Sequence, residues 1–76
     1  MPSLPELSYP EFCRFVEAYS LSVKGIGSPR IRGLNRQGDP FSFHAHPGHS
    51  VRPDQLRHVI RYLGLTPAEF WKWRGK

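Results

Sequence analysis

The chain has 76 residues, a net charge of +5 at pH 7, a pI near 10.0 and one cysteine, Cys13. This length predicts one small domain over residues 1–76, and the lone cysteine excludes an intramolecular disulfide. No window approaches the roughly 20 apolar residues of a membrane helix and no signal-peptide pattern opens the chain, which predicts a cytoplasmic protein. The excess of positive charge favours a polyanionic or acidic partner.

The first 20 residues predict a lead-in and a helix. Residues 1–8 carry two of the chain's prolines and read as an irregular lead-in. Ser8 is a candidate N-cap, with Pro10 in the first turn and Glu11 completing a Ser-x-x-Glu capping box, so a helix is expected over about residues 9–19. Its apolar face has the helical spacing i, i+3, i+4, i+7 and consists of Phe12, Phe15, Val16 and Tyr19. Cys13 lies beside this face and is interpreted as a packing residue.

Three strands are predicted in the middle of the chain. Residues 21–24 form a short candidate strand, which the segment GIGSP ends. Residues 30–36 alternate, with Arg30 and Arg32 on one face and Ile31 on the other. After the turn QGDP, residues 40–46 alternate more clearly. Their apolar face holds Phe41, Phe43 and Ala45, and their polar face holds Ser42, His44 and His46.

Two helices are predicted to follow. Pro53 opens the first, whose buried stripe is expected to be Leu56, Val59, Ile60 and Leu63 and whose solvent side carries Arg57, His58 and Arg61. Gly64 is placed to end it in a left-handed cap with Leu65 as the apolar partner. The segment Thr66-Pro67-Ala68-Glu69 is a second capping box. The short last helix contains Phe70, Trp71 and Trp73, and the tryptophans are expected to close the core.

The expected architecture is therefore α+β, a two-layer α-β-β-β-α-α domain with a three-stranded antiparallel sheet packed on helices. One core should contain the residues Phe12, Phe15, Val16, Phe43, Leu56, Val59, Ile60 and Leu63. The opposite sheet face should carry Arg30, Arg32, His44 and His46. By charge alone, two readings stay open. The basic residues could be only a solvated surface, or they could form one positive surface on a strand pair and a helix, made by Arg30, Arg32, Arg57 and Arg61 with His44 and His46 near it.

Several of these segments resemble the HicA-type toxins of bacterial and archaeal toxin–antitoxin systems. The resemblance rests on GSPRIRG, the glycine turn, FSFHAH and VRPDQLRHVIRYLGLTPAEF, and it covers roughly residues 9–71. It implies a fold similar to a double-stranded-RNA-binding domain. The implied activity is metal-independent endonuclease cleavage of mRNA, without a cofactor, and the implied protein partner is a HicB-like antitoxin.

The resemblance also identifies candidate site residues. Gly27 and Ser28 match the family's Gly-Ser pair, but Pro29 stands where the family has its catalytic histidine, and proline has no group for acid–base chemistry. An alignment shifted by one residue would place Arg30 there, which is a poor base. His46 and His44 are the remaining catalytic candidates, because histidine suits proton transfer near neutral pH. The RNA-binding candidates are Lys24, Gly27, Ser28, Arg30, Arg32, Arg57 and Arg61.

Two further readings stay open. The spacing of His44, His46 and His49 would allow three imidazoles to converge on zinc, but no nearby cysteine or carboxylate offers a fourth ligand, so no metal is expected. The main hypothesis is an RNA-binding HicA-like domain with weak or no nuclease activity. The alternative is a catalytically inactive interaction module that binds an acidic or HicB-like protein.

Overall fold

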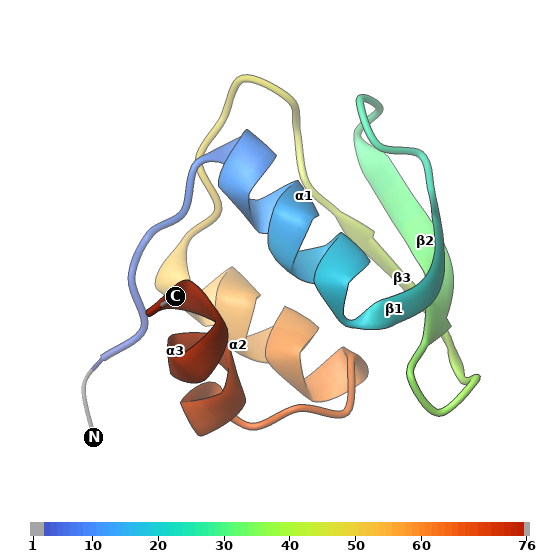
Figure 1. Ribbon diagram of the computed structural model, residues 1–76. Coiled ribbons are helices and arrows are strands. Elements are labelled where there is room, and N and C mark those ends of the chain that lie inside the picture. The colour runs from blue at the N-terminus through green and yellow to red at the C-terminus, as the bar shows by residue number, and fades with distance from the viewer. Residues whose placement is uncertain (1–2, 76) are drawn as a thin grey trace.

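The computed structural model describes residues 3–75, and its elements run in the predicted order (Figure 1). The helices are α1 (Tyr9–Ala18), α2 (Pro53–Tyr62) and α3 (Pro67–Arg74). The strands are β1 (Ser20–Lys24), β2 (Arg30–Asn35) and β3 (Pro40–His44). Within residues 3–75, none of the helices combines the length and apolar character needed to cross a bilayer.

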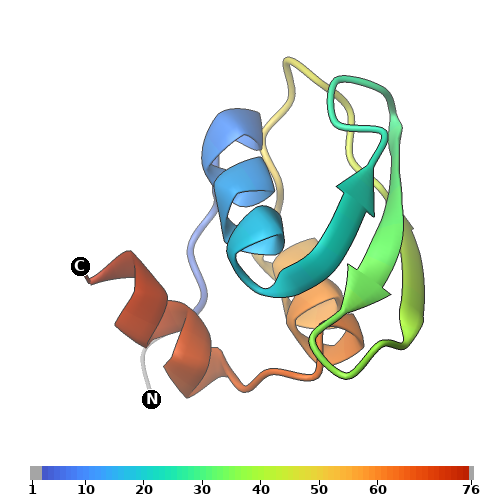
Figure 2. The same ribbon diagram turned by 45° about the vertical axis from the view of Figure 1, so that its right-hand side comes forward.

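The three strands form one antiparallel sheet in the order β1-β2-β3. Helices α1 and α2 lie on one side of this sheet, and α3 lies farther from it (Figure 2). The loop between β1 and β2 and the loop between β3 and α2 are at the same end of the molecule as the start of α1 (Figure 1). This is the predicted two-layer α+β architecture, and it leaves the second face of the sheet open.

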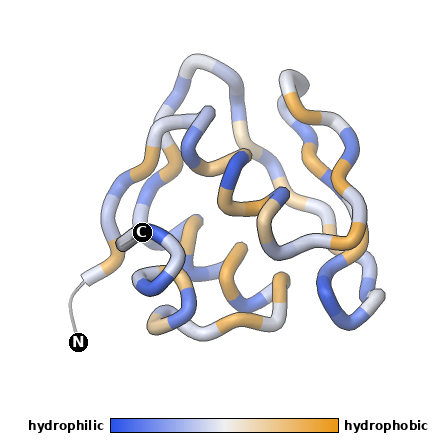
Figure 3. The backbone as a smooth tube through the Cα atoms, in the orientation of Figure 1, coloured by the Kyte–Doolittle hydropathy of each residue, from blue (hydrophilic) through white to orange (hydrophobic). Residues whose placement is uncertain are grey.

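The predicted core is confirmed, because all eight residues expected to share it belong to one buried cluster. Hydrophobic and hydrophilic residues alternate along the helices and strands that form the two layers (Figure 3). Phe12 meets Phe43 edge to face at 5.7 Å between ring centroids, which links α1 to the sheet. Phe15 meets Phe70 at 5.1 Å, which links α1 to α3. Trp71 and Trp73 pack partly buried against this cluster, as expected.

The helix ends follow the sequence signals with one exception. Gly64 has φ +73°, its N–H donates to Arg61 O and the next N–H, of Leu65, donates to Ile60 O, which is the predicted left-handed cap. Ser8 Oγ accepts from Glu11 N at 3.3 Å. The Glu11 carboxylate was expected to complete a capping box there. It lies instead 3.5 Å from Arg74 Nε, because α3 brings a cation to it.

The described part of the predicted lead-in, residues 3–8, is irregular as expected, but it also packs into the core. Leu4 and Leu7 are buried in the core cluster. Leu7 also forms an antiparallel bridge with Val51, in which each backbone N–H donates to the other's carbonyl, at 3.0 and 2.7 Å. The segment is irregular, but it packs and pairs because its two leucines cover the core beside α2. Residues 1–2 of the predicted lead-in lie outside the described part of the chain.

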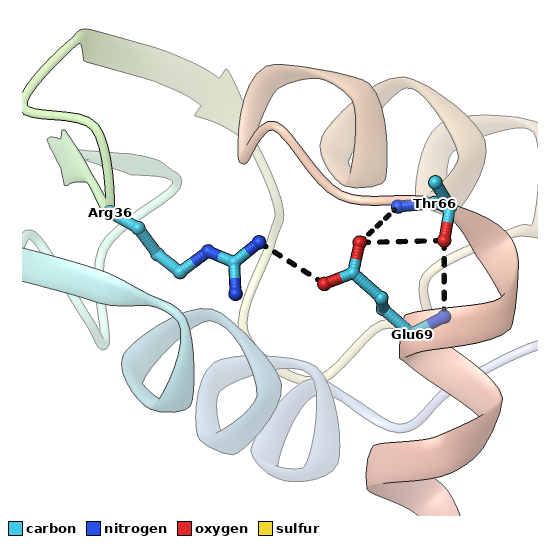
Figure 4. Close-up of polar contacts among 3 residues, drawn as sticks. All are labelled: Arg36, Thr66 and Glu69. Carbon is cyan, nitrogen blue, oxygen red and sulfur yellow. Dashed lines mark hydrogen bonds and ion pairs between the residues drawn. The ribbon is translucent and has the colours of Figure 1, made fainter.

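The turn between β2 and β3 is tied to the helices by side chains. Asn35 is buried, donates to Tyr62 O at 3.0 Å and accepts from two backbone N–H groups of the turn. Glu69 accepts from Thr66 N at 3.1 Å, in the predicted capping box, and its other oxygen is 3.1 Å from Arg36 Nη2 (Figure 4). These contacts join the hairpin to α2 and α3, so this end of the sheet has a structural role.

Candidate nucleic-acid interface

The open face of the sheet gathers basic residues by strand register. Lys24 is opposite Arg32, and Arg32 is opposite Ser42 on the next strand, so the three form one row across the sheet. Arg30 is opposite His44 in the neighbouring row. All of these side chains are exposed. The strands contain no aspartate or glutamate, so the face is uniformly basic or neutral.

This placement follows from the alternation of the strands. Ile31 pairs with Phe43, and both are buried against the helices, so Arg30 and Arg32 must point to the other face. Gly33 keeps β1 and β2 close: a Cβ on it would lie 2.0 Å from Ser22 O. The burial of Ile31 and Phe43 and the close approach at Gly33 together fix the register that brings Lys24 opposite Arg32.

The sheet cations have few competing partners. In the span 3–75, the ion pairs are Arg36–Glu69 and Arg74–Glu11, and neither involves the sheet face. Arg30 Nε donates to Ser42 Oγ at 3.3 Å, which leaves its other guanidinium donors toward solvent. Lys24, Arg30 and Arg32 are therefore placed to contact an anion without first breaking an ion pair.

Tyr9 organises the Gly-Ser loop beside this face. Its hydroxyl accepts from Gly27 N at 2.8 Å and donates to Ser28 O at 3.3 Å, which joins the loop to the start of α1. Ser28 Oγ lies 2.7 Å from Gly25 O, inside the loop. Gly25 has φ +87°, and a Cβ there would lie 2.1 Å from Arg30 O. The loop is therefore held in one conformation by these hydrogen bonds. The sequence did not identify Tyr9, because its contact with Gly27 spans 18 positions.

Pro29 leads directly into the basic face. It is exposed, and its carbonyl accepts from Ala45 N at 3.1 Å, which extends the pairing of β2 with β3 by one residue. Because side chains alternate along a strand, the ring at position 29 lies on the same side as Ile31, opposite the side of Arg30, and proline supplies no acid, base or nucleophile. Position 29, which the resemblance predicts to be catalytic, thus lies at the rim of the sheet, and its proline ring has no group for proton transfer.

The candidate histidines divide into two groups. His44 is on the sheet face, and its carbonyl accepts from the Gln55 amide. His46 follows the end of β3, and its ring is 6.0 Å from that of His49 between centroids, across a turn closed by His49 N and His46 O. The expected place of His46 on the strand face beside His44 is therefore wrong, because β3 ends at His44 and His46 lies in the following turn with His49. Among residues 3–75, no group of three potential metal ligands is brought together.

A groove of about 350 Å³ lies between the start of α1 and this histidine turn. Tyr9 and Pro10 line one side, and His49 and Ser50 line the other. Desolvation raises the pKa of Tyr9 above its ordinary value, and the protonated hydroxyl donates to Ser28 O. The groove thus adjoins the Gly-Ser loop through Tyr9, a residue common to both.

Cys13, one turn farther along α1, is buried, and this burial raises the pKa of its thiol. A protonated, buried thiol is a poor nucleophile. This agrees with the prediction that Cys13 is a packing residue.

Arg57 and Arg61 are held away from the sheet cations. Both line a separate hollow with Leu65 and Pro67, at the connection between α2 and α3. Gln55 of α2 donates to His44 O on β3, so its flank of the helix faces the sheet. Arg57 and Arg61 follow two and six positions later, and at 100° per residue this places them roughly on the opposite side of α2. The structure therefore gathers five of the seven RNA-binding candidates around β1 and β2, namely Lys24, Gly27, Ser28, Arg30 and Arg32. The arginine pair of α2 forms a second basic region, so the expectation of one positive surface shared by strand and helix is wrong.

Comparison of the chain with protein-family models and with curated proteins, and of its fold with solved structures, finds no significant match. What the open sheet face binds must therefore be inferred from its own residues and their geometry.

Proposed function

We propose that this protein is a HicA-like RNA-binding domain that holds the RNA backbone on the open face of its sheet. The observation that carries the proposal is the pair of cross-strand rows that contain Lys24, Arg30 and Arg32 on a sheet without a carboxylate. Arginine and lysine are the usual partners of phosphate oxygens in nucleic-acid interfaces. An mRNA substrate and a cytoplasmic location are part of this proposal.

Cleavage is expected to be weak or absent. The sequence resemblance assigns proton transfer to position 29, and Pro29 has no group that can accept the proton of a ribose 2′-hydroxyl. His46 and His44 are the fallback candidates for weak metal-independent endonuclease activity, and His49 joins them because its ring is beside that of His46. Binding is thus the primary activity, and hydrolysis of RNA is secondary.

The direct test is fluorescence anisotropy of the protein with a labelled RNA over a range of salt concentrations, in the presence of EDTA. For single-stranded nucleic acid, the logarithm of the binding constant falls with the logarithm of salt with a slope of about −0.7 per phosphate contact. Engagement of the three sheet cations predicts a slope of about −2. The absence of binding at low salt, or a slope near zero, would refute the proposal.

A protein partner is the second candidate function. Strand β1 is at one edge of the sheet, and Leu21 on it is 67% exposed, so an apolar side chain marks an unpaired strand edge. Such an edge suits the addition of a strand from a HicB-like or acidic protein. Leu21→Lys separates the two functions: it should abolish capture of that partner and leave RNA affinity unchanged or slightly higher.

A further inference from the structure

The basic row of the sheet adjoins an apolar row. Leu34 of β2 is opposite Pro40 of β3, one step along the strands from the row of Lys24, Arg32 and Ser42. Leu34 is 40% exposed although the core is close by. The open face therefore changes within two strand residues, a distance of about 7 Å, from cationic to apolar.

Both rows line one shallow hollow of about 470 Å³. Its cationic side is formed by Lys24 and Arg32 and its apolar side by Leu34 and Pro40. Ser22, opposite Leu34, and Ser42, opposite Arg32, also line it. No acidic residue lines it among the described residues. This volume falls within the range of about 300–1,000 Å³ that is typical of small-ligand sites.

A hollow that joins cations to apolar residues favours single-stranded over duplex RNA. A duplex presents phosphates on its outside and keeps its bases stacked within, so it could use the cations but not the apolar row. An unpaired nucleotide presents a phosphate and an exposed base together. The base can cover Leu34 and Pro40 while the phosphate contacts Lys24 and Arg32, so both halves of the hollow are occupied by one ligand.

We infer that this hollow is a nucleotide subsite for single-stranded RNA, with the base on Leu34 and Pro40 and its phosphate on Lys24 and Arg32. The inference rests on the proposed function and names its substrate class. Neighbouring nucleotides then extend past Arg30 and His44 toward Pro29, because those residues form the next row along the sheet.

The test compares a short oligouridylate with an abasic analogue that has the same ribose-phosphate backbone, for wild type and for Leu34→Ser. Loss of the bases should weaken binding to wild type by about three- to tenfold, the range expected for roughly 1 kcal/mol of lost apolar contact. It should weaken binding to Leu34→Ser by less than twofold, because the variant has already lost the apolar contact. Leu21→Ser, at an exposed leucine outside the hollow, is the matched control and should behave as wild type.

The outcomes distinguish failure of the nucleotide subsite from failure of RNA binding on the sheet as a whole. Equal affinity of wild type for the oligouridylate and its abasic analogue would overturn the nucleotide subsite and leave phosphate binding intact. Tighter binding of a duplex than of its single strand would overturn it as well. Failure of every RNA to bind would overturn the proposed function itself. Circular dichroism of Leu34→Ser confirms folding, which is expected because the side chain is partly exposed.

Discussion

Lys24, Arg30 and Arg32 on the sheet and Arg57 and Arg61 on α2 are all exposed cations, but the fold holds them differently. The sheet residues stand in cross-strand rows on strands without a carboxylate. On α2, Asp54 precedes Arg57 by one helical turn, a spacing at which side chains on a helix meet. The number of cations in a segment therefore does not define a binding surface. The strand register that groups the cations, and the absence of neighbouring acids, define it.

The largest effect is expected from introducing a histidine at the rim of the sheet face. If RNA on the sheet continues around this rim, Pro29→His brings an imidazole to it, and metal-independent cleavage should rise by about 10²- to 10⁴-fold. Gel analysis of a labelled RNA with EDTA measures the rate. Pro29→Gln is the matched control, because it also returns a backbone N–H but no base, and it should stay inactive.

Two results would move the chemistry elsewhere. If wild type already cleaves RNA strongly with EDTA present and His46→Ala or His49→Ala abolishes this activity, the histidine turn is the active site and Pro29 only shapes the loop. If Pro29→His binds RNA normally and gains no activity, the RNA does not pass over the rim of the sheet.

A second prediction concerns the register that brings the sheet cations together. Gly33→Ala places a Cβ against Ser22 O, so β1 must shift, at a cost of about 1–3 kcal/mol in the free energy of unfolding. RNA affinity should fall as well, because Lys24 would no longer be opposite Arg32. Urea denaturation and anisotropy measure the two effects. Gly75→Ala, at a φ of −75° at the end of α3, should change neither by much.

A smaller effect is expected at the loop beside the sheet face. Tyr9→Phe removes the hydroxyl that joins Gly27 and Ser28 to α1, which should lower the free energy of unfolding by about 1–2 kcal/mol. Amide hydrogen exchange at Gly27 should accelerate in the variant. Tyr62→Phe alters an exposed tyrosine of α2 and serves as the control. Unchanged exchange at Gly27 would show that Tyr9 does not order the loop.

The smallest effect is expected at the opposite end of the sheet. Glu69→Gln should cost at most about 1 kcal/mol of stability, because the ion pair with Arg36 is partly exposed and the glutamine still accepts in the capping box. RNA affinity should not fall, since Arg36 is outside the basic rows. A clear loss of affinity in this variant would show that the turn between β2 and β3 takes part in binding.

Local patterns predicted most of the fold. Capping residues, helical stripes and strand alternation identified every element to within about two residues, because each signal depends on neighbours in the chain. The packing of Leu4 and Leu7 and the pairing of Glu11 with Arg74 were not predicted. Both depend on segments that meet only after the chain has folded.

The candidate site was predicted in part. Alternation placed Arg30, Arg32 and His44 on one face, as observed, but it also placed His46 there, which lies beyond the end of β3. Sequence could not separate Arg57 and Arg61 from that face, because the rotation of α2 against the sheet depends on packing. It also could not pair His46 with His49, since the geometry of a loop with proline and glycine is not periodic. The hollow beside Leu34 appears only when the register of all three strands is known.

The salt dependence of RNA binding by two charge-matched double variants tests whether RNA lies on the sheet or on α2. Arg30→Ala/Arg32→Ala and Arg57→Ala/Arg61→Ala remove the same charge from the two basic regions. The account predicts that the sheet variant loses about 1.4 from the magnitude of the salt slope, the share of two phosphate contacts, while the α2 variant keeps the wild-type slope. Equal losses in both variants would show that RNA responds only to net charge, and a loss confined to the α2 variant would place the RNA on the helix.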